Sequence, residues 1–329
     1  MLKEKVLNTI KKYNLIENGD KVAVGVSGGP DSICLVNILN EIKKENRIDF
    51  ELFVCHINHG IRLEAKEDEE FVKRYCEEKQ IPFFVKHAKV EEFAKDMKMG
   101  TEEAGRKIRY DFFEEISKKT NANKIATAHT KNDNVETVLM NLIRGSGTSG
   151  LKGIQAIRDN KYIKPLIDIS RDEIEKYCKE RELNPRHDKT NDENIYTRNK
   201  IRNILIPLIK SEFNQNIIET IDRLSKLMDK ENVYLNKVTE DTYKKILIKE
   251  EKQEIILDLK RFNKENEVIK SRLILYTIKK LCGQTNGIEK IHIDDIIKLC
   301  QNNIGNKYLT PNKGLKILVN KGKMYFFVI

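Results

Sequence analysis

Residues 21–32 read KVAVGVSGGPDS, an apolar run that leads directly into two adjacent glycines. The run Val22–Val26 is short, continuous and rich in valine, which is typical of a buried strand. The apolar residues that follow Ser32 have helical spacing. The order of strand, glycine-rich turn and helix predicts a loop whose backbone N–H groups face an anion at the helix N-terminus.

Two common phosphate-loop patterns do not fit this turn. The Walker pattern needs Lys-Ser/Thr after its glycines, and the dinucleotide pattern needs a further glycine that opens the helix. What remains is S-G-G-x-D-S, in which Asp31 is the unusual member. A phosphate repels a carboxylate unless a cation lies between them, so we expect Asp31 to bind Mg²⁺. The alternative is that Asp31 only caps the helix.

Outward from this turn, the first half of the chain alternates strand-like and helix-like segments. This alternation predicts an α/β fold with a doubly wound, mostly parallel sheet. Ligands of such sheets bind beyond the carboxyl ends of the strands. The expected strands are 22–26, 50–57, 82–86 and 124–128, and the expected helices are 32–45, 67–79, 101–119 and 132–144.

The second half of the chain has a different pattern. From residue 211 it is charge-rich with helical spacing, so we place a domain boundary near residue 210. We expect residues 1–210 to form one domain and residues 211–329 a smaller, mainly helical domain. Within the second domain we expect helices at 267–281 and 292–300, a strand at 254–259, and a hairpin of 315–319 with 324–328.

Composition limits the classes of function. The 61 basic residues exceed the 51 acidic ones, giving a net charge of +10 that suits a polyanionic partner such as nucleic acid. The six cysteines form no C-x-x-C pair, so neither a zinc site nor a disulfide framework is predicted. No apolar run approaches the roughly 20 residues that cross a bilayer. We therefore expect a cytoplasmic protein with no membrane contact.

The S-G-G-P-D-S turn resembles the pyrophosphate-binding loop of the N-type ATP pyrophosphatases. That family cleaves ATP to AMP and pyrophosphate while it adenylates an oxygen of a second substrate. The resemblance implies an adenine nucleotide α-hydrolase-like fold with ATP and Mg²⁺ as cofactors. The implied ATP-binding residues in the turn are Ser27, Gly28, Gly29, Pro30, Asp31 and Ser32.

Five further stretches resemble, in order and spacing, the tRNA(Ile)-lysidine synthase family. The resemblance is strong over residues 20–210 and weak beyond them. It implies that residues 1–210 are the catalytic domain and that the domain of residues 211–329 contacts tRNA. The chain departs from the family at Thr130–Asp133, where members often have a second histidine and paired aspartates. Many members also carry a further C-terminal domain, and the sequence leaves open whether Ile329 is the natural end. The stretches are HINHGIR at 56–62, GTEEAGRKIRY at 100–110, AHTKNDNVET at 128–137, LIRGSG at 142–147 and YTRNKIR at 196–202.

The resemblance implies a specific reaction. The family joins the ε-amine of free L-lysine to C2 of the wobble cytidine in a CAU-anticodon isoleucine tRNA, which changes codon reading from AUG to AUA. ATP first adenylates the C2 oxygen, because that oxygen is a poor leaving group. A homodimer is compatible with the sequence. The alternatives are a tRNA thiolase on the same loop, a small-molecule synthetase of the GMP or NAD type, and a non-catalytic RNA-binding module.

Two groups of residues are candidates for the chemistry. We expect Arg106 to stabilise the transferring phosphoryl group. Asp133 and Glu136 lie one turn apart at a helix start, so they can hold the lysine ammonium and accept its proton. Their alternative role is to satisfy the helix dipole. His129 is a further candidate for the lysine site, with a buried strand-end histidine as the alternative.

The remaining candidates concern nucleotide and RNA binding. The resemblance implies that His56 and His59 line the adenosine pocket. Basic residues among polar ones suit the phosphates and splayed bases of an anticodon loop, although a solvated helix surface has the same composition. The candidate tRNA contacts are Arg144, Arg198, Asn199, Lys200 and Arg202.

Overall fold

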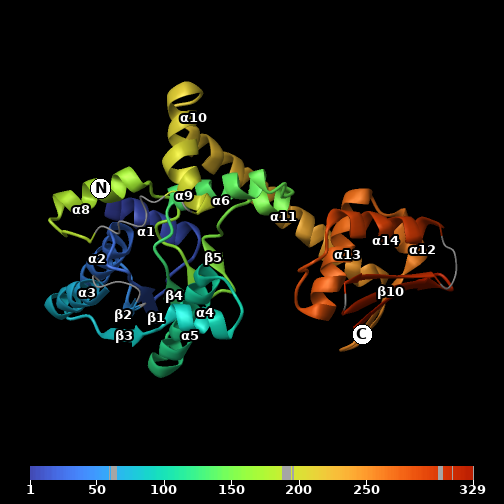
Figure 1. Cartoon of the computed structure of the whole chain (residues 1–329), viewed down its shortest axis with the longest axis horizontal. Coiled ribbons are helices and arrows are strands. Elements are labelled where there is room, and N and C mark those ends of the chain that lie inside the picture. Colours follow the sequence, from blue (N-terminus) through green and yellow to red (C-terminus); the bar gives the residue numbers. More distant parts are fainter. Residues whose placement is uncertain are drawn as a thin grey trace. The chain divides into compact units, whose positions relative to one another are not determined.

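The computed structural model of the chain describes residues 1–58, 60, 65–186, 194, 196–302, 307–312 and 314–328. The chain forms two compact units, residues 1–228 and 229–329 (Figure 1). The division falls within helix α11 (Ile217–Ile246), whereas the sequence pattern placed a boundary near residue 210. The first three turns of α11 therefore belong to unit 1.

Unit 1 contains the predicted mostly parallel sheet. Its strand order is β3-β2-β1-β4-β6-β5, and only β5 is antiparallel to its neighbour. The chain leaves β1 toward β2 and β3 on one side and later returns to β4 and β6 on the other. The strand order therefore reverses beside β1, which is where ligands of doubly wound sheets bind. The strands are β1 (Asp20–Gly25), β2 (Phe50–Asn58), β3 (Phe83–His87), β4 (Lys124–Ala126), β5 (Ile157–Arg158) and β6 (Tyr162–Ile163).

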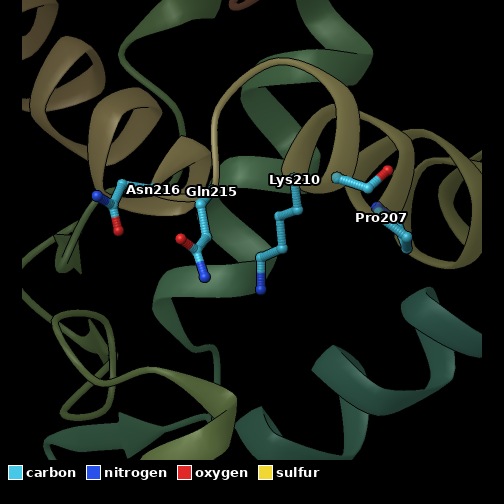
Figure 2. A pocket seen from close by; sticks show the side chains of 5 residues that line it. Pro207, Lys210, Gln215 and Asn216 are labelled. Atoms are coloured by element: carbon cyan, nitrogen blue, oxygen red, sulfur yellow. The ribbon is translucent and has the colours of Figure 1, made fainter.

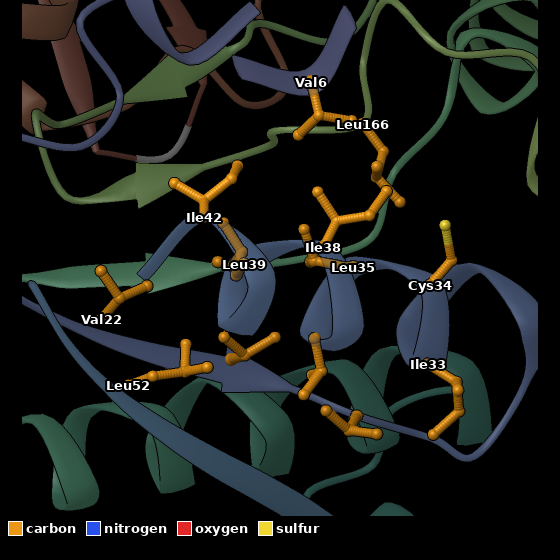
Figure 3. Close-up of a cluster of buried hydrophobic side chains, with 14 of the residues drawn as sticks. Val6, Val22, Ile33, Cys34, Leu35, Ile38, Leu39, Ile42, Leu52 and Leu166 are labelled. Carbon is orange, nitrogen blue, oxygen red and sulfur yellow. The ribbon is translucent and has the colours of Figure 1, made fainter. Parts of the chain in front are cut away.

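Helices cover both faces of this sheet, because alternate residues of the inner strands are apolar on both sides. Val22 and Val24 of β1 face a core made with helices on one side, shown in Figure 3. Ala23 faces the other side, where it packs with Phe112 and Phe113. The first core uses α1 (Leu2–Lys12), α2 (Pro30–Lys44), α3 (Ala65–Lys79) and α8 (Arg171–Glu180), and the second uses α5 (Thr101–Thr120).

A third group of helices packs beside the carboxyl edge of the sheet. Residues 197–212 form one continuous helical run that includes a π-helical turn, and sequence patterning did not predict it. Val138 of α6 packs with Ile201 and Ile206 of this run and with Ile221 of α11. The segments are α6 (Lys131–Ile143), α9 (Thr197–Lys200), the π-helix η2 (Ile201–Leu205) and α10 (Ile206–Glu212), and two short helices elsewhere are α4 (Val90–Asp96) and α7 (Thr148–Leu151).

Unit 2 is not mainly helical, so that prediction is wrong. Its five-stranded antiparallel sheet has the order β7-β8-β11-β10-β9, with α12, α13 and α14 packed on it (Figure 1). The three predicted strands form its centre. The two edge strands were not predicted because their residues are mostly polar and show no apolar alternation. The elements are β7 (Leu247–Glu250), β8 (Glu254–Asp258), α12 (Leu259–Lys264), α13 (Glu267–Cys282), α14 (Lys290–Asn302), β9 (Lys307–Asn312), β10 (Leu315–Asn320) and β11 (Lys323–Val328).

Candidate active site

The turn between β1 and α2 is held open by its own hydrogen bonds. Gly28 has φ +94°, a conformation that favours glycine. The Ser32 hydroxyl donates to the Gly29 carbonyl oxygen at 3.0 Å, and the Ser27 N–H donates to Ser32 Oγ at 3.2 Å. These bonds fix the loop around the N-terminus of α2, whose first N–H groups have no partner within the helix.

Asp31 lies in the first turn of α2 and does not cap it. The N-cap is Gly29, which makes no side-chain capping bond. Among the described residues, the buried Oδ1 of Asp31 has no hydrogen-bond partner. Burial, and then the nearby charge of Asp133, raises the pKa of Asp31 to about 6. Arg171 and Arg202 offset this only in part, and a buried carboxylate oxygen without a partner is costly, so these properties fit a bound cation such as Mg²⁺.

His56 lies near the carboxyl end of β2 and is buried. Its Nδ1 lies 2.9 Å from the Val26 carbonyl oxygen, so Nδ1 carries the proton. Burial lowers the pKa of His56 and keeps the ring neutral. Its buried Nε2 has no partner in the described part of the chain and can accept one hydrogen bond from a ligand. His59 lies outside the described residues.

Asp133 and Glu136 lie one turn apart on α6, and two arginines cover both. Arg198 donates from Nη2 to Asp133 Oδ1 at 2.9 Å and from Nε to Glu136 Oε2 at 2.8 Å. Arg202 donates from Nη2 to Glu136 Oε2 at 2.9 Å and lies 3.3 Å from Asp133 Oδ1. The Glu136 side chain is only 1% exposed. These four side chains, the acid–arginine cluster, form a compact group whose formal charges cancel.

Asp133 also stabilises the start of α6. Its Oδ2 accepts from the Thr130 N–H at 2.8 Å, and the Asp133 N–H donates to the Thr130 hydroxyl oxygen at 3.2 Å, which together form a capping box. Burial alone would raise the pKa of Asp133, but Arg198, His129 and the Thr130 bonds lower it below its ordinary value. Asp133 is therefore ionised at neutral pH.

His129 lies between β4 and α6. Its Nδ1 is 3.0 Å from the Thr127 hydroxyl oxygen. Burial lowers the pKa of His129 to about 4, and the charge of Asp133 only partly offsets this. Nearby cations, among them Lys164 and Arg198, lower it further. The imidazole is therefore neutral at physiological pH.

Arg106 lies on α5 in a group of cations and aromatic rings. Its Cζ lies 5.2 Å from the centroid of the Tyr110 ring, and the Cζ of Arg158 lies at the same distance from that ring. Tyr110 meets Tyr162 edge to face at 5.2 Å. Within the described residues, no contact joins Arg106 to Asp31 or to the acid–arginine cluster. Its expected role at the transferring phosphoryl group stays a prediction.

Comparison with known proteins gives one consistent result. A family model described as a PP-loop domain matches residues 2–209. The tRNA(Ile)-lysidine synthase of Clostridioides difficile is 46% identical over 98% of this chain and 69% of its own length. That of Clostridium acetobutylicum is 44% identical over 93% of this chain and 66% of its own length. The chain belongs to the tRNA(Ile)-lysidine synthase family. It spans about two thirds of the length of these relatives.

A solved structure outside this family shares the fold. A U34-tRNA thiolase from Methanococcus maripaludis superposes with a TM-score of 0.55 over 68% of this chain and 78% of its own, at 24% identity. That likeness concerns the PP-loop fold alone. The acid–arginine cluster and the loop with Asp31 are thus carried on a fold that tRNA(Ile)-lysidine synthases share with other enzymes.

Two of the predicted tRNA contacts in this tRNA(Ile)-lysidine synthase family member are held in ion pairs, and the tRNA contacts as a group stay a prediction. Arg198 and Arg202 are 33% and 24% exposed and pair with the carboxylates on α6. Arg144 and Lys200 are exposed, and Asn199 is half-buried. The pairing was missed because it depends on the packing of α6 against the 197–212 helix. The sequence did contain one indication of this pairing. The two arginines are four residues apart and the two acids three residues apart, so each pair lies on one face of a helix.

An open pocket of about 720 Å³ lies at the junction of α10 and α11 (Figure 2). None of the residues that line it was predicted to belong to the lysidine synthase site. None of them belongs to the turn at 27–32 or to the acid–arginine cluster. It is lined by Pro207, Lys210, Ser211, Gln215 and Asn216.

Proposed function

We propose that this chain uses ATP to join free L-lysine to C2 of the wobble cytidine in an isoleucine tRNA with a CAU anticodon. One observation carries the proposal. A PP-loop with an unpaired buried carboxylate, Asp31, lies within electrostatic range of a buried pair of carboxylates on α6, Asp133 among them. The relatives that the chain resembles along most of its length are named tRNA(Ile)-lysidine synthases.

The first half of the reaction belongs to the turn at 27–32. Its N–H groups and the serine hydroxyls suit the departing pyrophosphate, and the neutral His56 suits an adenosine donor group. Asp31 is the residue that would hold Mg²⁺, which when bound supplies positive charge to the phosphate oxygens. Among the described residues, no three His, Cys, Asp or Glu side chains lie together as a metal site, so phosphate oxygens would complete the set.

The second half belongs to the acid–arginine cluster. The lysine ammonium would take over contacts that Arg198 and Arg202 make with Asp133 and Glu136. Free lysine has an ε-amine pKa near 10.4, so the ammonium must first lose one proton to solvent before the neutral amine can attack C2. As its nitrogen bonds to C2, the C2–O bond to AMP breaks and the nitrogen becomes strongly acidic. A carboxylate of low pKa can then accept the proton.

Nothing specific favours the competing functions. A thiolase would need accessible sulfur, but five of the six cysteines are buried and Cys282 is half-buried. The function of a small-molecule synthetase would account for the loop at 27–32 but not for the net charge of +10. No helix in the described part of the chain is long and apolar enough to cross a bilayer. A cytoplasmic location and a homodimer are further proposals, and light scattering of the purified chain tests the second.

The proposal is tested with purified protein, ATP, labelled lysine and an unmodified CAU-anticodon isoleucine tRNA transcript. We expect AMP release and lysine incorporation that both require this tRNA. A methionine tRNA with the same anticodon serves as the matched control and should accept no lysine. Release of AMP with no lysine in the RNA, at any lysine concentration, would contradict the proposal.

A further inference from the structure

Lys164 follows β6 at the carboxyl edge of the sheet, next to the last residues of β4. The register pairs Ala126 with Ile163, and the Thr127 N–H donates to the Ile163 carbonyl oxygen at 3.0 Å. Thr127 and Lys164 are therefore neighbours across the two strands. Tyr162 lies on the α5 face of the sheet. Because side chains alternate along a strand, Lys164 is placed on that face too.

The Lys164 side chain is buried without a direct ion-pair partner among the described residues. The residue is only 8% exposed, and its Nζ has no hydrogen-bond or ion-pair partner among the residues that the structure describes. Of the other buried lysines, Lys3 pairs with Glu45 and Lys124 donates to the Asn160 carbonyl oxygen, whereas Lys270 on α13 of unit 2, like Lys164, has no partner for its Nζ among the described residues. A buried charge without a partner is costly, which indicates that an anionic ligand supplies the partner.

The charges nearest Lys164 agree with an anion site. Burial, followed by Arg158 and Arg106, lowers the pKa of Lys164 to about 8, and Asp159 offsets this in part. At pH 7 the amine is still mostly protonated. A bound anion would remove the strain of holding three cations close together.

His129 connects this cation to the acid–arginine cluster. His129 lies beside the hydroxyl of Thr127, which is the cross-strand neighbour of Lys164. The charges of both Lys164 and Asp133 affect the pKa of His129. The neutral His129 side chain therefore lies near both the carboxylate pair and the Lys164 ammonium. This order of charges matches a zwitterion that presents an ammonium to one end and a carboxylate to the other.

We propose that Lys164 binds the α-carboxylate of the substrate lysine, and this rests on the proposed function. A single buried cation suits a small anion better than it suits an RNA backbone, which needs exposed cations such as Arg106 and Arg158. Lys164 thereby selects a free amino acid over a diamine that offers the same terminal amine.

The test compares lysine with cadaverine, which has the amine without the carboxylate. With Lys164→Met we expect KM for lysine to rise at least tenfold, while KM for cadaverine, ATP and tRNA stays unchanged. Lys164→Arg keeps the cation and should restore most of the lysine affinity. The matched control is Lys161→Met, because Lys161 lies nearby but pairs with Glu114. The thermal midpoint of Lys164→Met should be no lower than that of the unmodified protein.

Several outcomes would overturn the inference. An equal rise in KM for lysine and cadaverine would mean that Lys164 does not read the carboxylate. A rise in KM for tRNA alone would assign Lys164 to an RNA phosphate. A normal lysine KM in Lys164→Met, with lysine transfer intact, would remove this inference and leave the proposed function standing. Absence of lysine transfer in the unmodified protein would remove both.

Discussion

At the scale of single residues, Glu136 is the centre of the acid–arginine cluster. Its carboxylate is 1% exposed and accepts from both Arg198 and Arg202. Glu136→Gln removes the charge and leaves two arginines under-compensated. We expect the free energy of unfolding to fall by about 1–3 kcal/mol, because the arginines are partly exposed and can rehydrate.

Urea unfolding measures this effect against a matched control. Glu219 pairs with Lys131 on the surface and is 55% exposed. Glu219→Gln should cost less than about 1 kcal/mol, as is usual for exposed pairs. Equal losses in the two variants would mean that the cluster contributes no more than a surface ion pair.

His129 makes stability depend on pH. Its pKa is about 4 in the folded chain and lies near 6.5 when exposed. Between these values the unfolded chain binds more protons, so stability falls as the pH drops from 6.5 toward 4. His129→Gln should reduce the difference in urea midpoint between pH 7 and pH 5. An NMR titration that found a His129 pKa above 6 would contradict the assignment.

At the scale of elements, the turn from β1 to α2 depends on one glycine conformation. Gly28 has φ +94°, whereas Gly29 has an ordinary φ of −74°. A Cβ at either position would lie no closer than 3.6 Å to a neighbouring atom, so steric crowding does not distinguish the two substitutions. We expect Gly28→Ala to cost about 1–2 kcal/mol more than Gly29→Ala in urea unfolding, from backbone strain. Equal costs would show that the loop relaxes without strain.

The same elements show what the sequence could predict. The continuous run Val22–Val26 and the glycines after it have local patterns that determine strand, turn and helix together. The capping box of Ser170 with Glu173 is a local signal of the same kind, since an S-x-x-E pattern at 170–173 marks the start of α8. In contrast, β7 and β9 were missed because they are polar edge strands whose only support is pairing with inner strands.

The site was less predictable than the fold for a related reason. Asp31 was singled out by its own chemistry beside a phosphate loop. The partners of Asp133 and Glu136 come from a helix more than 60 residues later, and only packing brings them together. Lys164 was missed because a lysine at a strand end has no distinguishing pattern until its burial is known.

At the scale of the whole molecule, the net charge of +10 predicts how the substrates respond to salt. A polyanion releases bound counter-ions when it binds, and a small zwitterion does not. Raising the salt from 50 to 200 mM should weaken tRNA binding by about tenfold or more. KM for lysine should change little. A lysine KM that rises as steeply as the dissociation constant for tRNA would contradict this separation.

All the predicted site residues that the structure describes lie in unit 1, the residues up to 228. The central claim is that two parts of this unit carry the two halves of one reaction. The turn with Asp31 activates the nucleotide, and the acid–arginine cluster delivers lysine. The two halves can be separated by variants that damage only one part.

The most direct measurement is a single-turnover reaction that follows adenylated tRNA and lysine-modified tRNA together. We expect Glu136→Gln to accumulate adenylated tRNA with little lysine product, and Asp31→Asn to form neither. Loss of both species to the same extent in the two variants would contradict the division of the site into an activating turn and a lysine-binding cluster.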